Sequence, residues 1–190
     1  MALKWSVHTE DKALIKACLC HDRVAQGCFY QKYFPDAYRA CNRYLSQYAD
    51  VMSVVNAGFL KVFQHLHHYD PALGSAGAWI HRIMVRTAID HIRQENRRFA
   101  SDPLPEGGEE TFSIESAVLT EMDAEALLAM VKKLPPMTRT VFNMAAIEGY
   151  SHREIAGELG VTESTSRWHL SEAKKRLQQL FRDSVKMISA

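Results

Sequence analysis

The chain has 190 residues, of which 47% are apolar and 24% are charged, and its formal net charge is +1. These values are typical of a soluble globular protein with one large or two small domains. The sequence has no run of 18 apolar residues, which argues against a membrane span, and its first twelve residues lack the apolar core of a signal peptide. We therefore expect a cytoplasmic protein without membrane insertion.

The charges are distributed unevenly. Residues 1–98 hold 13 Lys and Arg against 8 Asp and Glu, residues 99–121 hold none against 6, and residues 122–190 hold 10 against 8. Two mildly basic blocks therefore flank an acidic segment. Because neutralisation of phosphates supplies most non-specific DNA affinity, a chain this weakly basic is expected to bind DNA only with the help of a partner.

Apolar residues recur at helical spacing along the first half of the chain, and alternating β-branched runs are absent. Pro35 is expected to separate two of the helices, because proline removes a helical hydrogen bond. A turn-rich loop is expected over residues 70–77. The predicted helices cover residues 9–20, 23–33, 36–47, 51–67 and 78–97.

Two groups of residues have the composition of a metal site. One holds Cys18, Cys20, His21 and Cys28, and the other holds His65, His67, His68 and Asp70. The first fits no common zinc spacing, and in the second the middle histidine lies off the helix face of the others. We favour reduced, buried cysteines, with Cys41 as a further one, and we expect neither a metal nor another cofactor.

The helix predicted over 78–97 carries a row of arginines. Arg82, Arg86, Arg93 and Arg97 are separated by four, seven and four residues, so they share one side of the helix. Trp79 stands at the helix start, and an aromatic ring beside arginines suits unpaired DNA bases, which stack on it. The alternatives are a core anchor for Trp79 and a solvated face for the arginines. No catalytic motif is visible, and we expect no enzyme.

Residues 99–121 interrupt the helical pattern with two prolines, two adjacent glycines and only negative charges. This composition predicts a flexible acidic linker. Beyond it, helices are predicted over 124–133 and 137–147. The predicted fold is therefore all-α, with a helical domain at 1–98, the linker at 99–121 and a second helical domain at 122–190.

Residues 150–177 have the pattern of a helix-turn-helix. Ser151 and Glu154 have capping-box spacing, Gly160 suits the exit of the first helix, and Thr162 is placed to cap the second helix, predicted over 163–177. An apolar stripe of Leu170, Ala173 and Leu177 lies among basic residues, which are Arg167, His169, Lys174 and Arg176. This pattern favours docking into the DNA major groove. The alternative is a helical hairpin with a solvated charged face.

Longer strings carry a resemblance to a known family. In residues 23–98, FYQKYFPDAYRACNRYL, GFLKVF and AWIHRIMVRTAIDHIRQENRR resemble region 2 of sigma-70 family RNA polymerase sigma factors. In residues 122–182, LPPMTRTVFNMAAIEGYSHREIAGELGVTESTS and the tail AKKRL resemble region 4. The two-domain layout resembles the extracytoplasmic-function (ECF) group, and the string VFNMAAIEGYSH is similar to Bacteroidetes-type members.

The resemblance implies a promoter-specificity subunit of RNA polymerase. Trp79 and the arginine row would read and open the −10 element. The residues implied in −35 recognition are His152, Arg153, Glu163, Ser164, Thr165, Arg167, Trp168, His169, Lys174 and Arg176. Those implied in binding the clamp helices of the polymerase β′ subunit are Ser53, Asn56, Ala57, Phe59 and Leu60. The β flap of core RNA polymerase, promoter DNA and an anti-sigma factor are the further implied partners.

Some positions depart from the family pattern. The family usually has an acidic residue where Ser53 stands, Gln at Asn56 and Glu at Ala57, so polymerase affinity is expected to differ. Departures on the second helix of the helix-turn-helix prevent transfer of a −35 sequence; they are Ser164, Ser166, Trp168, His169 and Glu172. The alternative function is a self-sufficient dimeric helix-turn-helix regulator. A third is a small-molecule or metal-dependent helical enzyme using Cys18, Cys20 and the histidines.

Overall fold

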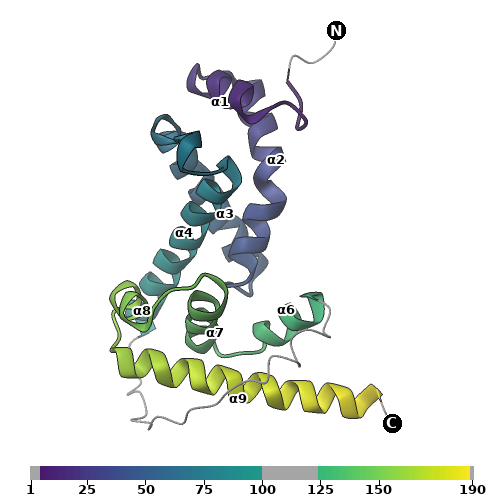
Figure 1. Cartoon of the computed structure of the whole chain (residues 1–190), viewed down its shortest axis with the longest axis vertical. Helices are drawn as coiled ribbons and strands as arrows, with labels where there is room; N and C mark the ends of the chain where they lie inside the picture. Colours follow the sequence, from purple (N-terminus) through teal and green to yellow (C-terminus); the bar gives the residue numbers. More distant parts are fainter. Residues whose placement is uncertain (1–4, 100–123, 189–190) are drawn as a thin grey trace. The chain divides into compact units, whose positions relative to one another are not determined.

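The structure, a computed structural model, describes residues 5–99 and 124–188; the side chains of residues 96–99, 124–125 and 185–188 are not described. The chain forms two compact units, residues 1–91 and 92–190 (Figure 1). Every regular element in the described part is helical, which confirms the predicted all-α fold. The predicted acidic linker lies outside the described residues except for Phe99, and the predicted domain boundaries stay predictions.

The N-terminal unit contains α1 (Asp11–Leu19), α2 (Arg23–Asn42), α3 (Tyr48–His65) and most of α4 (Ala76–Phe99). Two 3₁₀ turns, η1 (Leu66–His68) and η2 (Pro71–Leu73), connect α3 to α4. Helix α2 packs against both α1 and α3. The core is apolar, and its most deeply buried large side chains include Leu14, Phe29, Val55, Val62, Met84 and Ile89.

Helix α2 continues through Pro35, so the prediction of separate helices over 23–33 and 36–47 is wrong. A proline in a helix interior costs about 3 kcal/mol. Pro35 and Gln31, whose carbonyl loses its helical donor, both lie on the exposed side of α2. The opposite side is a continuous buried stripe of Phe29, Tyr33, Ala37, Ala40 and Cys41. Burial of this stripe offsets the loss of one hydrogen bond, since each large side chain contributes about 1.5–3 kcal/mol.

The four cysteines are free thiols. Cys18 and Cys41 are buried as predicted, whereas Cys28 is half-buried and Cys20 is exposed, so the prediction of burial is wrong for Cys20. Burial raises the pKa of the Cys18 thiol to about 11 and that of Cys41 to about 12. Within residues 5–99 and 124–188, no three His, Cys, Asp or Glu side chains gather as a metal site would require.

The C-terminal unit contains α6 (Ala124–Lys132), α7 (Pro136–Phe142), α8 (His152–Leu159) and α9 (Glu163–Ile188). The predicted helix over 137–147 is α7 followed by a turn of π-helix, η3 (Asn143–Ile147). The core cluster contains Val131, Leu134, Phe142, Ala173 and Leu177. Helices α7 and α8 both pack along α9.

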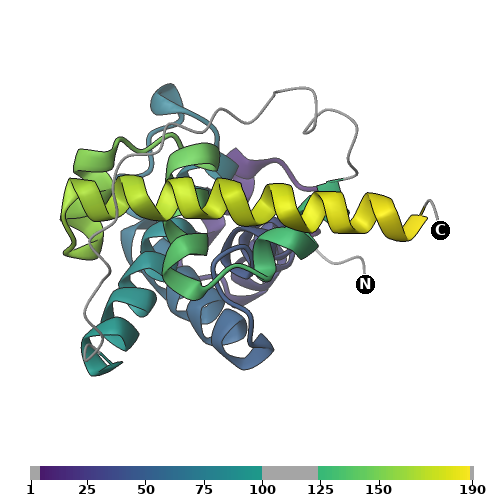
Figure 2. The same ribbon diagram turned by 90° about the horizontal axis from the view of Figure 1, so that it is seen from below.

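Helix α9 is longer than predicted. It continues past residue 177 to Ile188, as an uninterrupted helix in Figures 1 and 2. Leu180 and Phe181 are half-buried, so part of the apolar surface of α9 continues beyond Leu177. In the described part of the chain, no helix is both long and apolar enough to cross a membrane.

Helices α3 and α4 approach closely at Gly58. A Cβ atom added to Gly58 would lie 2.4 Å from Met84 Sδ and 3.0 Å from Met84 Cε. Met84 is fully buried in α4, so its side chain would have to move within a packed core. Glycine at this position therefore allows the helices to come together.

We predict that Gly58→Ala destabilises the protein by about 1–3 kcal/mol, because an extra methyl overpacks the core. Urea denaturation of the full chain measures the change. Gly27→Ala on α2 is the control, since a Cβ there would meet nothing within 4 Å and alanine favours the helix. Equal stabilities of the two variants would show that Met84 does not set the spacing of α3 and α4.

Candidate nucleic-acid interface

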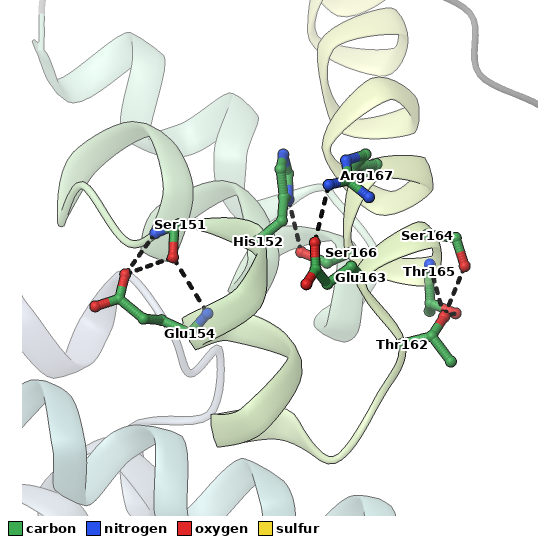
Figure 3. A network of polar contacts seen from close by, with 9 residues as sticks. All are labelled: Ser151, His152, Glu154, Thr162, Glu163, Ser164, Thr165, Ser166 and Arg167. Carbon is green, nitrogen blue, oxygen red and sulfur yellow. Dashed lines mark hydrogen bonds and ion pairs between the residues drawn. The ribbon is translucent and has the colours of Figure 1, made fainter.

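The N-terminus of α8 is capped by the predicted capping box of Ser151 and Glu154 (Figure 3). The Glu154 amide donates to Ser151 Oγ at 3.3 Å, and the Ser151 amide donates to Glu154 Oε2 at 2.8 Å. Ser151 Oγ also donates to Glu154 Oε2 at 2.7 Å, and these bonds lower the pKa of Glu154. Both partners satisfy amide groups that a helix start leaves open, so the first residue of α8 is well defined.

The turn between α8 and α9 also follows the prediction. Gly160 has the left-handed conformation, with φ 70° and ψ 33°, and its amide donates to the Ala156 carbonyl at 2.9 Å. Thr162 Oγ1 then accepts a hydrogen bond from the Thr165 amide at 3.1 Å and caps α9 (Figure 3). The turn is thereby held at both ends, which places the N-terminal residues of α9 relative to α8.

One side of α9 is buried against the other helices of its unit. The buried residues are Ser166, His169, Ala173 and Leu177, which are separated by three, four and four positions. This stripe differs from the predicted apolar stripe, because Leu170 is only half-buried and two polar residues extend the stripe toward the helix start. Ser166 Oγ lies 2.9 Å from His152 Nδ1 of α8, and His169 Nδ1 lies 3.0 Å from Thr138 Oγ1 of α7.

The expectation that His169 faces DNA is therefore wrong. Its side chain is 5% exposed and is turned toward α7. His152 is half-buried and bonded to Ser166, so it also serves the interior of the unit. Polar residues at these positions read as surface residues in the sequence, because burial of a polar group depends on the partner that meets it.

The opposite side of α9 presents Ser164, Trp168, Ser171 and Lys175, separated by four, three and four positions. At about 100° per residue this row lies roughly opposite Ala173. Ser164 and Lys175 are exposed, and the other two are half-buried. The sequence interpretation missed Ser171 and Lys175. The same spacing rule, applied from the far side of the buried stripe, would have found them.

The remaining predicted residues of the helix-turn-helix flank this row. Arg167 is paired with Glu163 at 2.9 Å, and Arg176 is paired with Glu172, each one turn apart on α9. Exposed pairs of this kind contribute at most about 1 kcal/mol, so a phosphate can replace the carboxylate. The other members of the set are Arg153, which is exposed on α8, and Thr165 and Lys174, which are half-buried on α9.

On α4, Arg82 and Arg86 are exposed and Arg93 is half-buried, while the Arg97 side chain lies outside the described residues. Trp79 is half-buried, and its ring lies 5.6 Å from that of Tyr69. The Tyr69 hydroxyl donates to the Gly74 carbonyl at 3.0 Å. Trp79 is therefore held by the loop before α4 but retains an exposed part beside the first arginines.

Tyr69 and Asp70 hold that loop together. Asp70 Oδ1 accepts a hydrogen bond from the Ala72 amide at 2.9 Å, and Gly74 has a φ of 142°. Ser75 Oγ accepts from the Ala78 amide at 3.2 Å and begins α4, two residues earlier than predicted. The approach to Trp79 is thus structured by local hydrogen bonds.

The predicted polymerase-binding residues on α3 form an exposed face with one exception. Ser53, Asn56, Ala57 and Leu60 are exposed, and Leu60 is 59% exposed. Phe59 is 2% exposed and packs against the Tyr30 ring at 4.4 Å, so its expected place on this surface is wrong. The Tyr30 hydroxyl donates to Asn56 Oδ1 at 3.1 Å.

Comparison with known proteins finds two family models. Residues 29–98 match Sigma-70 region 2, and residues 124–177 match Sigma-70, region 4. The chain is 28% identical over 145 residues to "ECF RNA polymerase sigma factor SigE" of Mycolicibacterium smegmatis, covering 74% of this chain and 55% of that protein. It is 24% identical over 172 residues to "ECF RNA polymerase sigma factor SigM" of Mycobacterium tuberculosis, covering 90% and 84%. The chain therefore spans about half the length of the first relative.

Two solved structures are also similar. One is CnrH in complex with the cytosolic domain of CnrY, at 21% identity and a TM-score of 0.45, covering 91% of this chain and 97% of that chain. The other is the sigma factor RpoE in complex with the anti-sigma factor NepR from Bartonella quintana, at 16% identity and a TM-score of 0.47, covering 80% and 94%.

We predict that Ser151→Ala lowers the stability of the C-terminal unit by about 1 kcal/mol, because the capping box loses one of its partners. Hydrogen exchange of the α8 amides in the full chain measures the effect. Ser53→Ala is the control, since Ser53 is exposed within α3 and caps no helix. Unchanged exchange in α8 of the Ser151 variant would contradict the capping role.

Proposed function

This chain belongs to the sigma-70 family of RNA polymerase sigma factors, and we propose that it is an ECF-type member that directs core RNA polymerase to promoters. The observation that carries the proposal is the match of one chain to both region 2 and region 4. The protein would act in the cytoplasm and without catalytic chemistry of its own. The proposed domains are residues 1–98 and 122–190. From the resemblance to Bacteroidetes-type members, we also propose that the chain comes from a bacterium of that group.

We assign −35 recognition to the face of α9 opposite its buried stripe. Its central row is Ser164, Trp168, Ser171 and Lys175, flanked by Arg153, Glu163, Thr165, Arg167, Lys174 and Arg176. Hydroxyl, aromatic and cationic groups in one row suit a major groove, which offers hydrogen-bonding base edges, thymine methyl groups and phosphates. His152 and His169 are not assigned to this interface.

The −10 element is assigned to α4 and the loop before it. Arg82 and Arg86 are exposed one turn apart, and Trp79 lies one turn before Arg82. Guanidinium groups would hold the phosphates of a strand whose bases stack on the indole. Arg93 and Arg97 extend the same row along the helix.

The exposed face of α3 is assigned to the β′ clamp helices of core RNA polymerase. This face combines two polar residues with two apolar residues and has no acidic one; they are Ser53, Asn56, Ala57 and Leu60. An apolar contact centred on Leu60 would then contribute more to this interface than ion pairs do. The β flap of polymerase for the C-terminal unit and an anti-sigma factor complete the proposed partners.

The first test is promoter-fragment binding by the purified protein, with and without core RNA polymerase. Binding and strand opening that require core polymerase are expected, because the chain's net charge of +1 supplies little phosphate affinity. Tight, specific binding by the protein alone, with two-fold stoichiometry, would instead establish a dimeric helix-turn-helix regulator.

We predict that Lys175→Ala weakens promoter binding by the polymerase complex and lowers the salt dependence of log K by about one. Lys175 is exposed on the proposed DNA face of α9. Anisotropy titrations over a salt series measure both quantities. Lys16→Ala, an exposed lysine of α1 outside the matched regions, is expected to change neither. A salt dependence equal to that of the unmodified protein would remove Lys175 from the interface.

We predict that Ala57→Glu strengthens binding to core polymerase by up to about fivefold, since an exposed ion pair contributes about 0.2–1 kcal/mol. Sigma factors of this family usually have glutamate at this position, and Ala57 is exposed on α3. Competition for labelled core polymerase measures the affinity. Gln31→Glu on the exposed side of α2 adds the same charge and is expected to have no effect. Equal or weaker affinity of the Ala57 variant would mean that this surface meets a differently charged partner.

A further inference from the structure

Two polar contacts join α9 to the helices behind it. His169 Nδ1 lies 3.0 Å from Thr138 Oγ1 of α7, and His152 Nδ1 of α8 lies 2.9 Å from Ser166 Oγ (Figure 3 shows the second contact). We call these four residues the histidine clasp. They stand on three different helices: one contact joins α9 to the preceding helix α8, and the other joins it to α7, which is not adjacent to α9 in the chain.

Three of the four clasp residues are buried, and His152 is half-buried. Ser166 is 0% exposed, Thr138 is 2% exposed and His169 is 5% exposed. A polar group that loses water without gaining a partner costs about 1–3 kcal/mol, so each of these hydrogen bonds has to form if α9 is to stay in place. Apolar stripes tolerate small rotations of a helix, whereas a hydrogen bond weakens steeply with distance and angle.

We propose that His169, together with His152, is a positioning residue for −35 recognition, which holds the rotation of α9 through hydrogen bonds made by neutral imidazole rings. The inference rests on the proposed function, because it assigns the rotation of α9 to the presentation of Trp168 and Lys175. A rotation of one residue step, about 100°, would turn that row away from a groove. Neither histidine touches DNA in this assignment.

The rings have to be neutral because a charge on the clasp is poorly stabilised. His169 Nε2 is buried and has no hydrogen-bond partner within the described residues. With both ring nitrogens protonated, an imidazolium would leave an N–H donor without a partner and a positive charge in this buried position, whichever nitrogen carries the proton in the neutral ring. Burial accordingly lowers the pKa of His169 from its ordinary value of 6.5, and Glu172 opposes this only in part.

The surroundings of His152 act in the same direction. Its pKa is lowered by burial first and then by the positive charges of Arg167 and Lys174, against the opposing charge of Glu163. The helices packed against α9 carry further charged groups. On α7 this is Arg139, whose guanidinium donates to the Lys132 carbonyl at 3.2 Å. On α8 they are Arg153, Glu154 and Glu158. The buried charged side chain among these, Arg139, is itself a cation.

Both histidine pKa values are lowered in the folded protein, so the folded state binds fewer protons than the unfolded state near pH 6. The clasp is therefore fully present above the ordinary value of 6.5 and is lost as the pH falls through the lowered values. The sequence of residues 92–190 contains two histidines, His152 and His169. A histidine titration observed in that unit therefore belongs to the clasp.

The test compares two promoters with the complex of the full chain and core polymerase. One promoter is obtained by selection with that complex, and the other is the same DNA with its −35 element scrambled. The ratio of their dissociation constants reports −35 recognition alone, since effects of pH on polymerase and on the rest of the DNA appear in both. The ratio is measured from pH 7.5 down to the lowest pH at which the complex stays assembled.

We expect the ratio in the unmodified protein to fall as the pH drops through the lowered histidine pKa values, because protonation of the imidazole rings then releases the clasp. The double variant His152→Asn/His169→Asn keeps amides that can bond Ser166 and Thr138 but cannot take up a proton, so its ratio should stay constant within about twofold. His8→Asn, an exposed histidine of the N-terminal unit, should behave like the unmodified protein. A constant ratio in the unmodified protein, or a parallel fall in the double variant, overturns the proposal.

A promoter ratio near one at pH 7.5 would instead contradict the assignment of −35 recognition to α9, and the clasp is then tested by its effect on stability. Thr138→Val removes the hydroxyl and keeps the shape of the side chain. We expect it to destabilise α9 in hydrogen exchange at pH 7.5 and to have less effect as the pH falls through the lowered pKa values, where the clasp is released. An effect that does not change with pH would mean that Thr138 and His169 do not act as a proton-dependent unit.

Discussion

The attachment of α9 to α7 and α8 is the constraint on which the candidate interface depends. A recognition surface on a helix is defined by rotation about the helix axis, and rotation is defined by what the helix buries. Here Ala173 and Leu177 supply the apolar part of the contact, while Ser166 and His169 supply hydrogen bonds of fixed direction. The row from Ser164 to Lys175 faces outward because that opposite stripe is held. The caps at Ser151 and Thr162 fix where α8 and α9 begin, and so define the position of α9 along its own axis.

The N-terminal unit presents its surfaces through the same division between a buried and an exposed side. Because α2 continues through Pro35, its buried stripe from Phe29 to Cys41 packs against the neighbouring helices without interruption. Gly58 allows α3 to approach Met84 of α4. These contacts leave Leu60 on the outer face of α3 and Arg82 and Arg86 on the outer face of α4. Phe59 shows how sharply the two sides of α3 are divided, because it is buried although the next residue, Leu60, is exposed.

Charge on the candidate interface is moderate and partly compensated. Arg167 and Arg176 each have a glutamate partner one turn away, and Lys61 lies 3.4 Å from Asp90. Such pairs are weak in water and exchange readily for phosphate, but they reduce the field that draws a protein to DNA on its own. This moderate charge is consistent with the proposed dependence on core polymerase.

The sequence by itself determined the helical fold, the helix-turn-helix with its caps at Ser151, Gly160 and Thr162, and the family. The helices and their caps follow from interactions between residues within a few positions of one another, whereas the family is recognised from the longer strings that carry the resemblance. Tertiary structure decided the rest. Pro35 lies inside a helix because burial across α2 exceeds one lost hydrogen bond. His169 and Ser166 are interior residues because Thr138 and His152, distant in the chain, meet them there. Whether a polar side chain is buried depends on a partner that no local pattern contains, and that partner decides which face of α9 is free.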